Sequence, residues 1–242
     1  MSINEVHYEF KLMKDRVDSL SNQDFNPAEI DWFIKKAQLK FIEHRMSPFS
    51  NRRAQGFEAS QKRIDDLSTL VIKYPLQPAL IPSLDNGVYE VPLSSLAFPY
   101  LHLISAYADV TVSSDCTKEV MLRFIQHDDI RESLRDPFNN PSLEFLPYNF
   151  GRSSSSSSQS SIYVYPGTLI IPAVYLEYVR YPKSPSLGNY TYLDGTITAT
   201  QDLELPPHTH SEVISLAVMI ASLAVEDPQS VQFKAQDLAL SE

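Results

Sequence analysis

The residues closest to a metal-binding pattern are two histidines near the end of the chain. His208 and His210 follow Glu204, and imidazole and carboxylate groups are ligands that Zn²⁺ accepts in proteins. However, residues at positions i and i+2 point to opposite faces of a strand and lie about 200° apart on a helix. The spacing therefore disfavours a metal site, and Thr209 between the histidines is better explained as the N-cap of a helix.

Catalysis would require a convergent group of polar residues, and two places in the sequence resemble one. His127 is followed by Asp128 and Asp129, but this run is typical of a strand end followed by an N-cap aspartate. Cys116 has Asp115 beside it and no cationic neighbour that would stabilise its thiolate. The six glycines never occur as GxG, and GxSxG is absent. The sequence therefore predicts no enzyme, with no catalytic, cofactor-binding or metal-binding residues and no cofactor.

A cluster of basic residues stands out in an otherwise acidic protein. Arg52, Arg53, Lys62 and Arg63 lie close together in a chain whose formal net charge is −10. This cluster could contact DNA or an acidic neighbouring subunit, or it could be an ordinary solvated face. No aromatic residues alternate with the cations, which argues against stacking on nucleic-acid bases.

Composition sets the broad class of the protein. The chain has 242 residues, of which 43% are hydrophobic, so it can bury a sizeable core as one or two domains. Its single cysteine cannot form an intramolecular disulfide, which fits assembly in the cytosol. The first residues, MSINEVHYEFKLMKD, lack a basic start followed by an apolar run, so we expect no signal peptide or membrane anchor.

Helical patterns occupy the beginning of the chain. Ser2 and Glu5 form a capping box, and apolar residues then recur at helical spacing from Val6 to Leu20. A second helix is predicted after Asn26, and the short gap favours a helical hairpin. A weaker pattern predicts a third helix over 57–67. The core face of the second helix is expected to include Ile30, Ile34, Ala37 and Phe41, with Trp32 and Phe33 beside them, and both Trp32 and Phe41 are expected to be buried.

A last helix is predicted from Thr209. Thr209 and Glu212 have the spacing of a second capping box, and Asp227-Pro228 ends the pattern. The span from Val213 to Val225 contains no charge but is too short to cross a bilayer. We therefore expect a packing helix, with a core face made of Val213, Leu216, Ala217, Ile220, Leu223 and Ala224.

Between these helices the apolar residues alternate with a period of two, which indicates strands. Many prolines keep these strands short, and the GRSSSSSSQSS tract at 151–161 predicts a flexible loop. The loop could order on assembly or could be a solvated hairpin tip. The predicted fold class is α+β, in which the N-terminal helical hairpin and the C-terminal helix pack beside an antiparallel β domain. The expected parts are an N-terminal helical region at 1–69, the β domain at 70–202, and a C-terminal helix and tail at 203–242.

Three stretches of the sequence carry a resemblance to a known family. They are FNPAEIDWFIKKAQLKFIEHRM near the start, DIRESLRDPFNNP with VYLEYVRYPKSP in the strand region, and DLELPPHTHSEVISLAVMIASLAVEDP near the end. Together they resemble the head-to-tail connector proteins, also called ring or adaptor proteins, of short-tailed phages. The resemblance is greatest to those of crAss-like Bacteroides phages.

The resemblance implies a structural role in the virion. Such proteins form a closed ring of their own copies, typically twelve-fold, in the neck beneath the portal protein and next to neighbouring tail rings. Genomic DNA passes through such a ring, no catalytic residues are carried over, and assembly takes place in the host cytoplasm without a membrane. An acidic subunit suits a conduit that must not hold DNA, because each phosphate contact adds grip.

Two other functions remain open at this point. A tail knob, collar or baseplate component would also lack catalytic motifs. A β-sandwich module could bind glycans through tyrosines that alternate at strand spacing: Tyr163, Tyr165, Tyr175, Tyr178 and Tyr181.

Overall fold

The computed structural model describes residues 1–14, 25–46, 61–81, 87–113, 116–136, 138–152, 160–191 and 197–224. The chain forms two compact units. The helical unit contains Met1–Leu70 and Pro182–Glu242, and the sheet unit contains Val71–Tyr181. The sheet unit thus ends at Tyr181, whereas the change of sequence pattern pointed to position 202.

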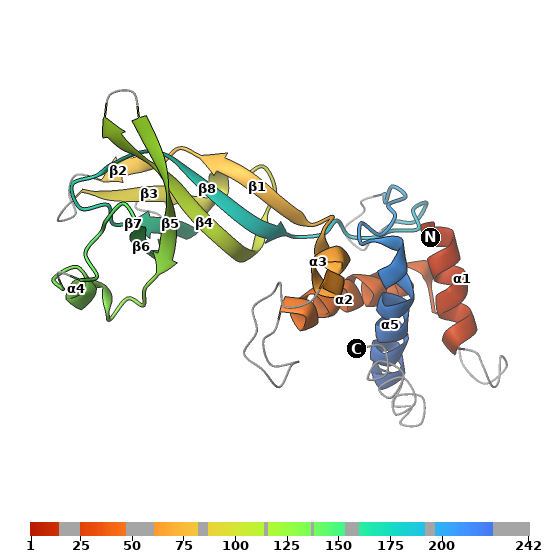
Figure 1. Cartoon of the computed structure of the whole chain (residues 1–242). Helices are drawn as coiled ribbons and strands as arrows, with labels where there is room; N and C mark the ends of the chain where they lie inside the picture. The colour runs from red at the N-terminus through yellow and green to blue at the C-terminus, as the bar shows by residue number, and fades with distance from the viewer. Residues whose placement is uncertain are drawn as a thin grey trace. The chain divides into compact units, whose positions relative to one another are not determined.

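The helical unit is built on three longer helices. They are α1 (Ile3–Lys14), α2 (Pro27–Met46) and α5 (His210–Ala224), with the shorter α3 (Gln61–Leu67) and the 3₁₀ turn η4 (Pro207–Thr209). Helix α5 contacts both α1 and α2, so the end of the chain completes the core that the first helices begin (Figure 1). This packing confirms the predicted association of the N-terminal and C-terminal helices.

The first two helices begin as their sequences predict. The backbone N–H of Ser2 donates to Glu5 Oε2 at 2.9 Å, and the Glu5 N–H donates to Ser2 Oγ at 3.4 Å. At the start of α2 the Asn26 N–H donates to Glu29 Oε2 at 2.8 Å. These bonds satisfy backbone donors that a helix leaves unpaired at its first turn.

The capping box predicted for the last helix is wrong. The Thr209 hydroxyl donates to the Pro206 carbonyl oxygen at 2.9 Å, and Thr209 closes η4 rather than capping α5. Glu212 turns its carboxylate to Arg45 and Lys62. A charged partner binds a carboxylate more strongly than a neutral backbone donor does. Glu212 therefore forms ion pairs instead of capping the helix.

The core of the helical unit contains the predicted face of α2, but it excludes the tryptophan. Phe41 is 2% exposed, whereas Trp32 is 52% exposed, so the prediction that Trp32 is buried is wrong. Trp32 lies two residues from both Ile30 and Ile34, which places it about 200° around the helix from that face. In α5 the predicted core residue Leu223 is also exposed. The buried residues of these two helices include Ile30, Phe33, Ile34, Ala37, Phe41, Val213, Ile214, Leu216, Ala217 and Ala221.

The sheet unit contains one eight-stranded sheet. Its strands are β1 (Val71–Leu76), β2 (Ala79–Ile81), β3 (Val88–Pro92), β4 (Tyr100–Ser113), β5 (Cys116–Phe124), β6 (Phe145–Arg152), β7 (Ser160–Val164) and β8 (Ile170–Arg180). Their order in the sheet is β1-β8-β4-β5-β6-β7-β3-β2. The first and last strands in this order, β1 and β2, are separated in the chain only by Gln77 and Pro78, so the sheet curls on itself (Figure 1).

The α+β class is confirmed, with one departure from an antiparallel sheet. Strands β5 and β6 are parallel, and every other neighbouring pair is antiparallel. Parallel strands need a long crossover connection, which here carries the short helix α4 (Ile130–Ser133). A second short element, the 3₁₀ turn η3 (Leu93–Ser95), follows β3.

The curl of the sheet encloses its core. Alternating residues of the long strands point inward, as the period of two predicts, and the buried cluster includes Ala106, Ala108, Val110, Val120, Leu122, Leu146, Ile162, Val174, Leu176 and Tyr178. The serine tract joins β6 to β7, but the predicted loop bounds of 151–161 are too wide: Gly151 and Arg152 of β6 pair with Ser161 and Ser160 of β7. Residues 153–159 of the tract lie outside the described part of the chain.

Candidate interaction surfaces

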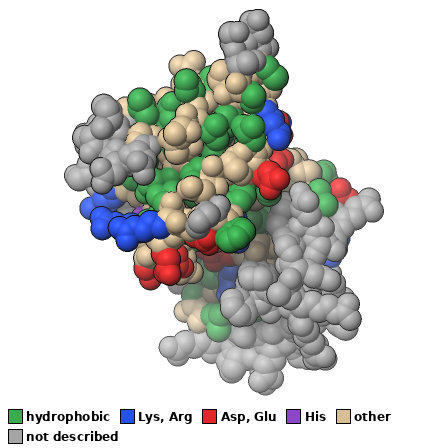
Figure 2. Space-filling view, turned by 60° about the vertical axis from the view of Figure 1, so that its left-hand side comes forward, with side chains coloured by type: hydrophobic (Ala, Val, Ile, Leu, Met, Phe, Trp, Pro, Cys, Tyr) green, Lys and Arg blue, Asp and Glu red, His purple; other side chains and the backbone are tan. Residues whose placement is uncertain are grey.

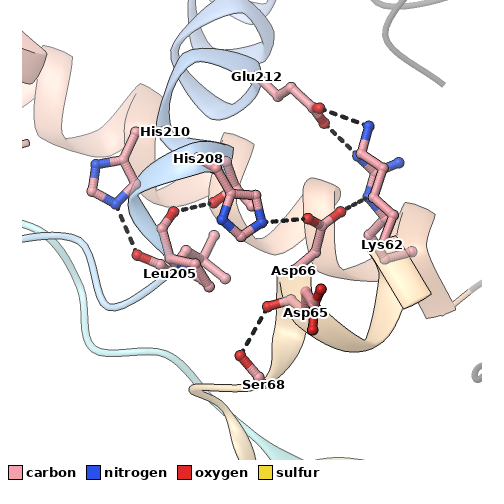
Figure 3. A network of polar contacts seen from close by, with 11 residues as sticks. Lys62, Asp65, Asp66, Ser68, Leu205, His208, His210 and Glu212 are labelled. Carbon is pink, nitrogen blue, oxygen red and sulfur yellow. Dashed lines mark hydrogen bonds and ion pairs between the residues drawn. The ribbon is translucent and has the colours of Figure 1, made fainter. Parts of the chain in front are cut away.

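The histidines of the possible metal pattern have separate structural partners. His208 Nε2 donates to Asp66 Oδ1 at 2.9 Å, and His210 Nε2 donates to the Leu205 carbonyl oxygen at 2.8 Å (Figure 3). Glu204 instead accepts from the Lys183 N–H at 2.8 Å. Within the described ranges, no group of three or more His, Cys, Asp or Glu residues could hold a metal ion.

The other polar candidates do not converge either. His127 lies next to the Asn149 amide at 3.3 Å, and Cys116 is exposed at the start of β5. Asp129 occupies the N-cap position of α4, as the sequence predicts for this aspartate pair, but its side chain makes no cap hydrogen bond. The backbone of Asp129 is already in the helical region, a conformation from which an N-cap side chain does not reach the first turn.

The basic cluster is only partly described. Arg52 and Arg53 lie outside the described residues, as does the side chain of Arg63. Lys62 forms an ion pair with Glu212 at 3.1 Å. This lysine therefore links α3 to α5 within the helical unit.

A buried ionic network joins α2, α3 and α5, and the sequence analysis did not detect it. Arg45 Nε lies 2.8 Å from Asp66 Oδ2, and Arg45 Nη2 also pairs with Glu212. The Asp66 side chain is fully buried, and His208 contacts its other oxygen (Figure 3). These residues are far apart in the sequence, so no local pattern could reveal the network.

A second buried carboxylate holds the segment after Tyr181 to the helices. Asp31 Oδ1 lies 2.6 Å from His7 Nε2, which links α2 to α1. Its other oxygen accepts the Leu187 N–H at 2.9 Å and the Tyr190 hydroxyl. These bonds explain why residues after 181 belong to the helical unit although their composition resembles that of the strand region.

The exposed Trp32 lines an open groove on the helical unit. The groove has a volume of about 1110 Å³, and its apolar wall includes Phe25, Phe33 and Pro185. The Trp32 ring packs edge-on against Phe33, with ring centroids 5.2 Å apart. Glu29 at i−3 and Lys35 at i+3 also line the groove, and Lys36 Nζ lies 5.5 Å from the Trp32 ring centroid.

The sheet unit presents a second apolar surface, a row of cross-strand neighbours that runs across five strands. The row follows the registers Pro75–Tyr175, Tyr175–Tyr107, Tyr107–Met121 and Met121–Phe145. The Tyr107 and Tyr175 rings stack at 5.1 Å, and the Met121 side chain is 67% exposed. We call these five residues the aromatic row.

Cations cover part of the aromatic row. Lys73 Nζ lies 4.5 Å from the Tyr107 ring centroid, and the Arg123 guanidinium lies 5.7 Å from that of Phe145. On the other side of the row, the hydrogen bond and charge of Asp109 raise the pKa of the Tyr175 hydroxyl. The space-filling view likewise shows hydrophobic side chains over one face, with Lys or Arg and Asp or Glu groups at its border (Figure 2). Such mixed surfaces, apolar at the centre and charged at the rim, are typical of protein–protein contacts.

Comparison with known proteins identifies the family to which the chain belongs. The sequence matches the family described as "Phage tail ring protein 3/4" over residues 1–231. The chain belongs to this family. It is also 22% identical, over 236 residues, to "Ring protein 4/5" of Bacteroides phage crAss001, a match that covers 93% of this chain and 94% of the relative.

The family match confirms the resemblance found in the sequence. The protein is a structural ring protein of a phage virion, and the surfaces of both units are to be read as those of a subunit in an assembly. Among the described helices, none is long and apolar enough to cross a membrane.

Proposed function

We propose that this ring protein is a head-to-tail connector, which forms a closed ring in the neck between the portal and the tail. The observation that carries the proposal is the family match over nearly the whole chain. Its partners are its own copies, the portal protein and the neighbouring tail rings. The expected symmetry is twelve-fold, which the resemblance to phage connectors implies.

Ring closure requires contact surfaces on each subunit, and the exposed surfaces described above can provide them. Copies in a cyclic ring contact one another head to tail, so each subunit needs two different surfaces that fit each other. The groove at Trp32 and the aromatic row are two such exposed apolar areas on different units of the chain. A lateral contact between the sheet unit of one copy and the groove of the next would leave the remaining helical surfaces for docking onto an adjacent ring.

The charge of the subunit suits a conduit for DNA. The chain has 30 acidic and 20 basic residues, so a ring of copies carries a large negative charge. Phosphate contacts from Lys and Arg would add a salt-dependent grip on the passing duplex, which an acidic ring avoids. We propose that genomic DNA passes through the ring without sequence-specific binding.

The proposed role is non-enzymatic, and the glycan-binding alternative has less support. Tyr178 is fully buried, where burial raises the pKa of its hydroxyl, and that hydroxyl donates to the Phe98 carbonyl oxygen. The Tyr163 hydroxyl donates to the Arg152 carbonyl oxygen. These two tyrosines therefore stabilise the sheet unit rather than bind a ligand. A tail knob, collar or baseplate location remains the alternative that particle structure would distinguish.

Co-production with the portal protein tests the proposed function. Mass photometry of the purified complex should show one ring of copies for each portal, with a copy number equal to that of the portal. The subunit alone can stay monomeric, because ring closure can require the portal as a template. A protein that never associates with the portal or with a neighbouring ring protein contradicts the connector role.

The serine tract gives a second test of assembly. We propose that the loop between β6 and β7 contacts an adjacent subunit or ring, since low-complexity segments order on binding. Deletion of residues 153–158 should then reduce assembly and infectivity. Unchanged assembly and infectivity would mean that the loop is only a solvated tip.

A further inference from the structure

The groove at Trp32 has the character of a binding site for a projecting side chain. Trp32 is the chain's single tryptophan, and more than half of its surface is exposed although it stands beside the apolar residues Phe25, Phe33 and Pro185. Tryptophan is enriched among the few interface residues that supply most of the binding energy. The groove is open rather than enclosed, and an inserted aromatic side chain would bury both itself and the indole.

The sheet unit carries a side chain of the required kind. Phe138 is 92% exposed, the highest fraction among the large hydrophobic residues of the described part of the chain. It stands on a turn that its neighbours hold in place. The Phe138 N–H donates to Asp136 Oδ1 at 3.0 Å, and the Asn139 side-chain amide donates to Asp136 Oδ2 at 2.6 Å. These bonds reduce the entropy that binding of this loop would cost.

The charges around the two surfaces are complementary. Glu29 and Lys35 line the groove on either side of Trp32 along α2, and Lys36 Nζ lies 5.5 Å from the Trp32 ring centroid. Beside Phe138, the exposed Arg135 and the carboxylate of Asp136 supply one cation and one anion. A contact that brings Asp136 toward Lys35 and Lys36, and Arg135 toward Glu29, would pair opposite charges, and such complementarity fixes the register of an interface.

We propose that Phe138 of one copy inserts into the Trp32 groove of the next copy around the ring. This inference rests on the proposed function, because it uses the head-to-tail contact that a closed ring requires. The knob and the groove lie on different units of the same chain, so every copy offers one of each. The contact therefore repeats from copy to copy until the ring closes.

Chemical cross-linking tests the contact in assembled particles or portal complexes of the full chain. The exposed Cys116 is first replaced by Ser, and Lys35→Cys in the groove lining and Asn140→Cys beside the knob are then introduced together, which leaves Trp32 and Phe138 in place. With a short bismaleimide, the double variant should yield a ladder of covalent oligomers that extends to the full ring. Each single variant should yield no ladder, because a knob must meet a groove.

A matched control uses another exposed aromatic residue of the helical unit. Tyr8 on α1 is 67% exposed and does not line the groove, so Tyr8→Cys with Asn140→Cys should not form the ladder. In addition, Trp32→Ala and Phe138→Ala should each weaken ring assembly by about 30-fold, the effect of an interface hot spot. The two effects should not add in the double alanine variant, because both remove the same contact.

The outcomes separate this inference from the proposed function. Rings that form without the ladder, and that tolerate both alanine variants, overturn the Trp32–Phe138 contact and leave the ring itself standing. Dimers from a single-cysteine variant would indicate a symmetric contact and also overturn the inference. If no ring forms in any complex with the portal, the proposed function fails as well.

Discussion

The ion pair between Arg45 and Asp66 offers a direct test of how the helical unit is held together. Arg45→Met keeps the length of the side chain but leaves the fully buried Asp66 carboxylate without its cation. His208 remains as a partner at 2.9 Å, although its own side chain is half exposed. Removal of one partner of a buried ion pair costs about 3–5 kcal/mol, and we expect a loss of unfolding free energy in this range.

Two further variants show whether the cost comes from the buried charge. Arg45→Met combined with Asp66→Leu removes both charges, and apolar replacement of a whole buried pair is often close to neutral. The double variant should therefore recover most of the lost stability. Lys62→Met removes a lysine that is 45% exposed, and a surface ion pair of this kind contributes only about 0–1 kcal/mol.

Urea unfolding of the dilute protein measures these changes. Trp32 is the only tryptophan and lies in α2, so its fluorescence reports on the helical unit. The midpoint should fall for Arg45→Met and return in the double variant, with the slope unchanged. An Arg45→Met variant within about 1 kcal/mol of wild type, or a double variant less stable than the single one, refutes the reasoning.

Three other perturbations follow from the structure. In urea unfolding followed by circular dichroism, Phe41→Ala should cost about 3–5 kcal/mol, whereas Trp32→Ala should cost less than about 1 kcal/mol, because only the first ring is in the core; equal costs would contradict the assignment. Gly151→Ala places a Cβ 2.4 Å from a Tyr163 ring carbon and should cost about 1–3 kcal/mol, an increment that should shrink in a Tyr163→Leu background. Burial lowers the pKa of His210 below 6.5, so the unfolded chain takes up a proton first as pH falls. Unfolding free energy should therefore decline below about pH 6.5, and the decline should be smaller in His210→Gln; identical pH profiles would argue against this group.

Local patterns in the sequence predicted the starts of the first two helices because the interactions involved are local. The Ser2–Glu5 capping box is made within one turn, and its spacing alone determines it. Trp32 shows the limit of such reasoning. Size and hydrophobicity suggested burial, but its angle around α2 places it outside the core. That exposure is now the most informative feature of the helical unit.

Interactions between distant residues could not be predicted. The parallel pairing of β5 and β6 depends on the crossover through α4, while each strand by itself has the same alternation as its antiparallel neighbours. In the sequence Asp66 looks like a surface charge and Glu212 like a capping residue, and only the meeting of three helices brings both into a buried network with Arg45. Asp31 likewise gains its partners from the segment after Tyr181.

The measurement that tests the central claim most directly is a reconstruction of the phage particle by electron cryo-microscopy. The connector proposal predicts that this chain forms one symmetric ring on the DNA axis between the portal and the tail, with as many copies as the portal. A ring elsewhere along the tail would keep the family role and contradict the connector position. Copies on the capsid surface or on peripheral fibres would contradict the account as a whole.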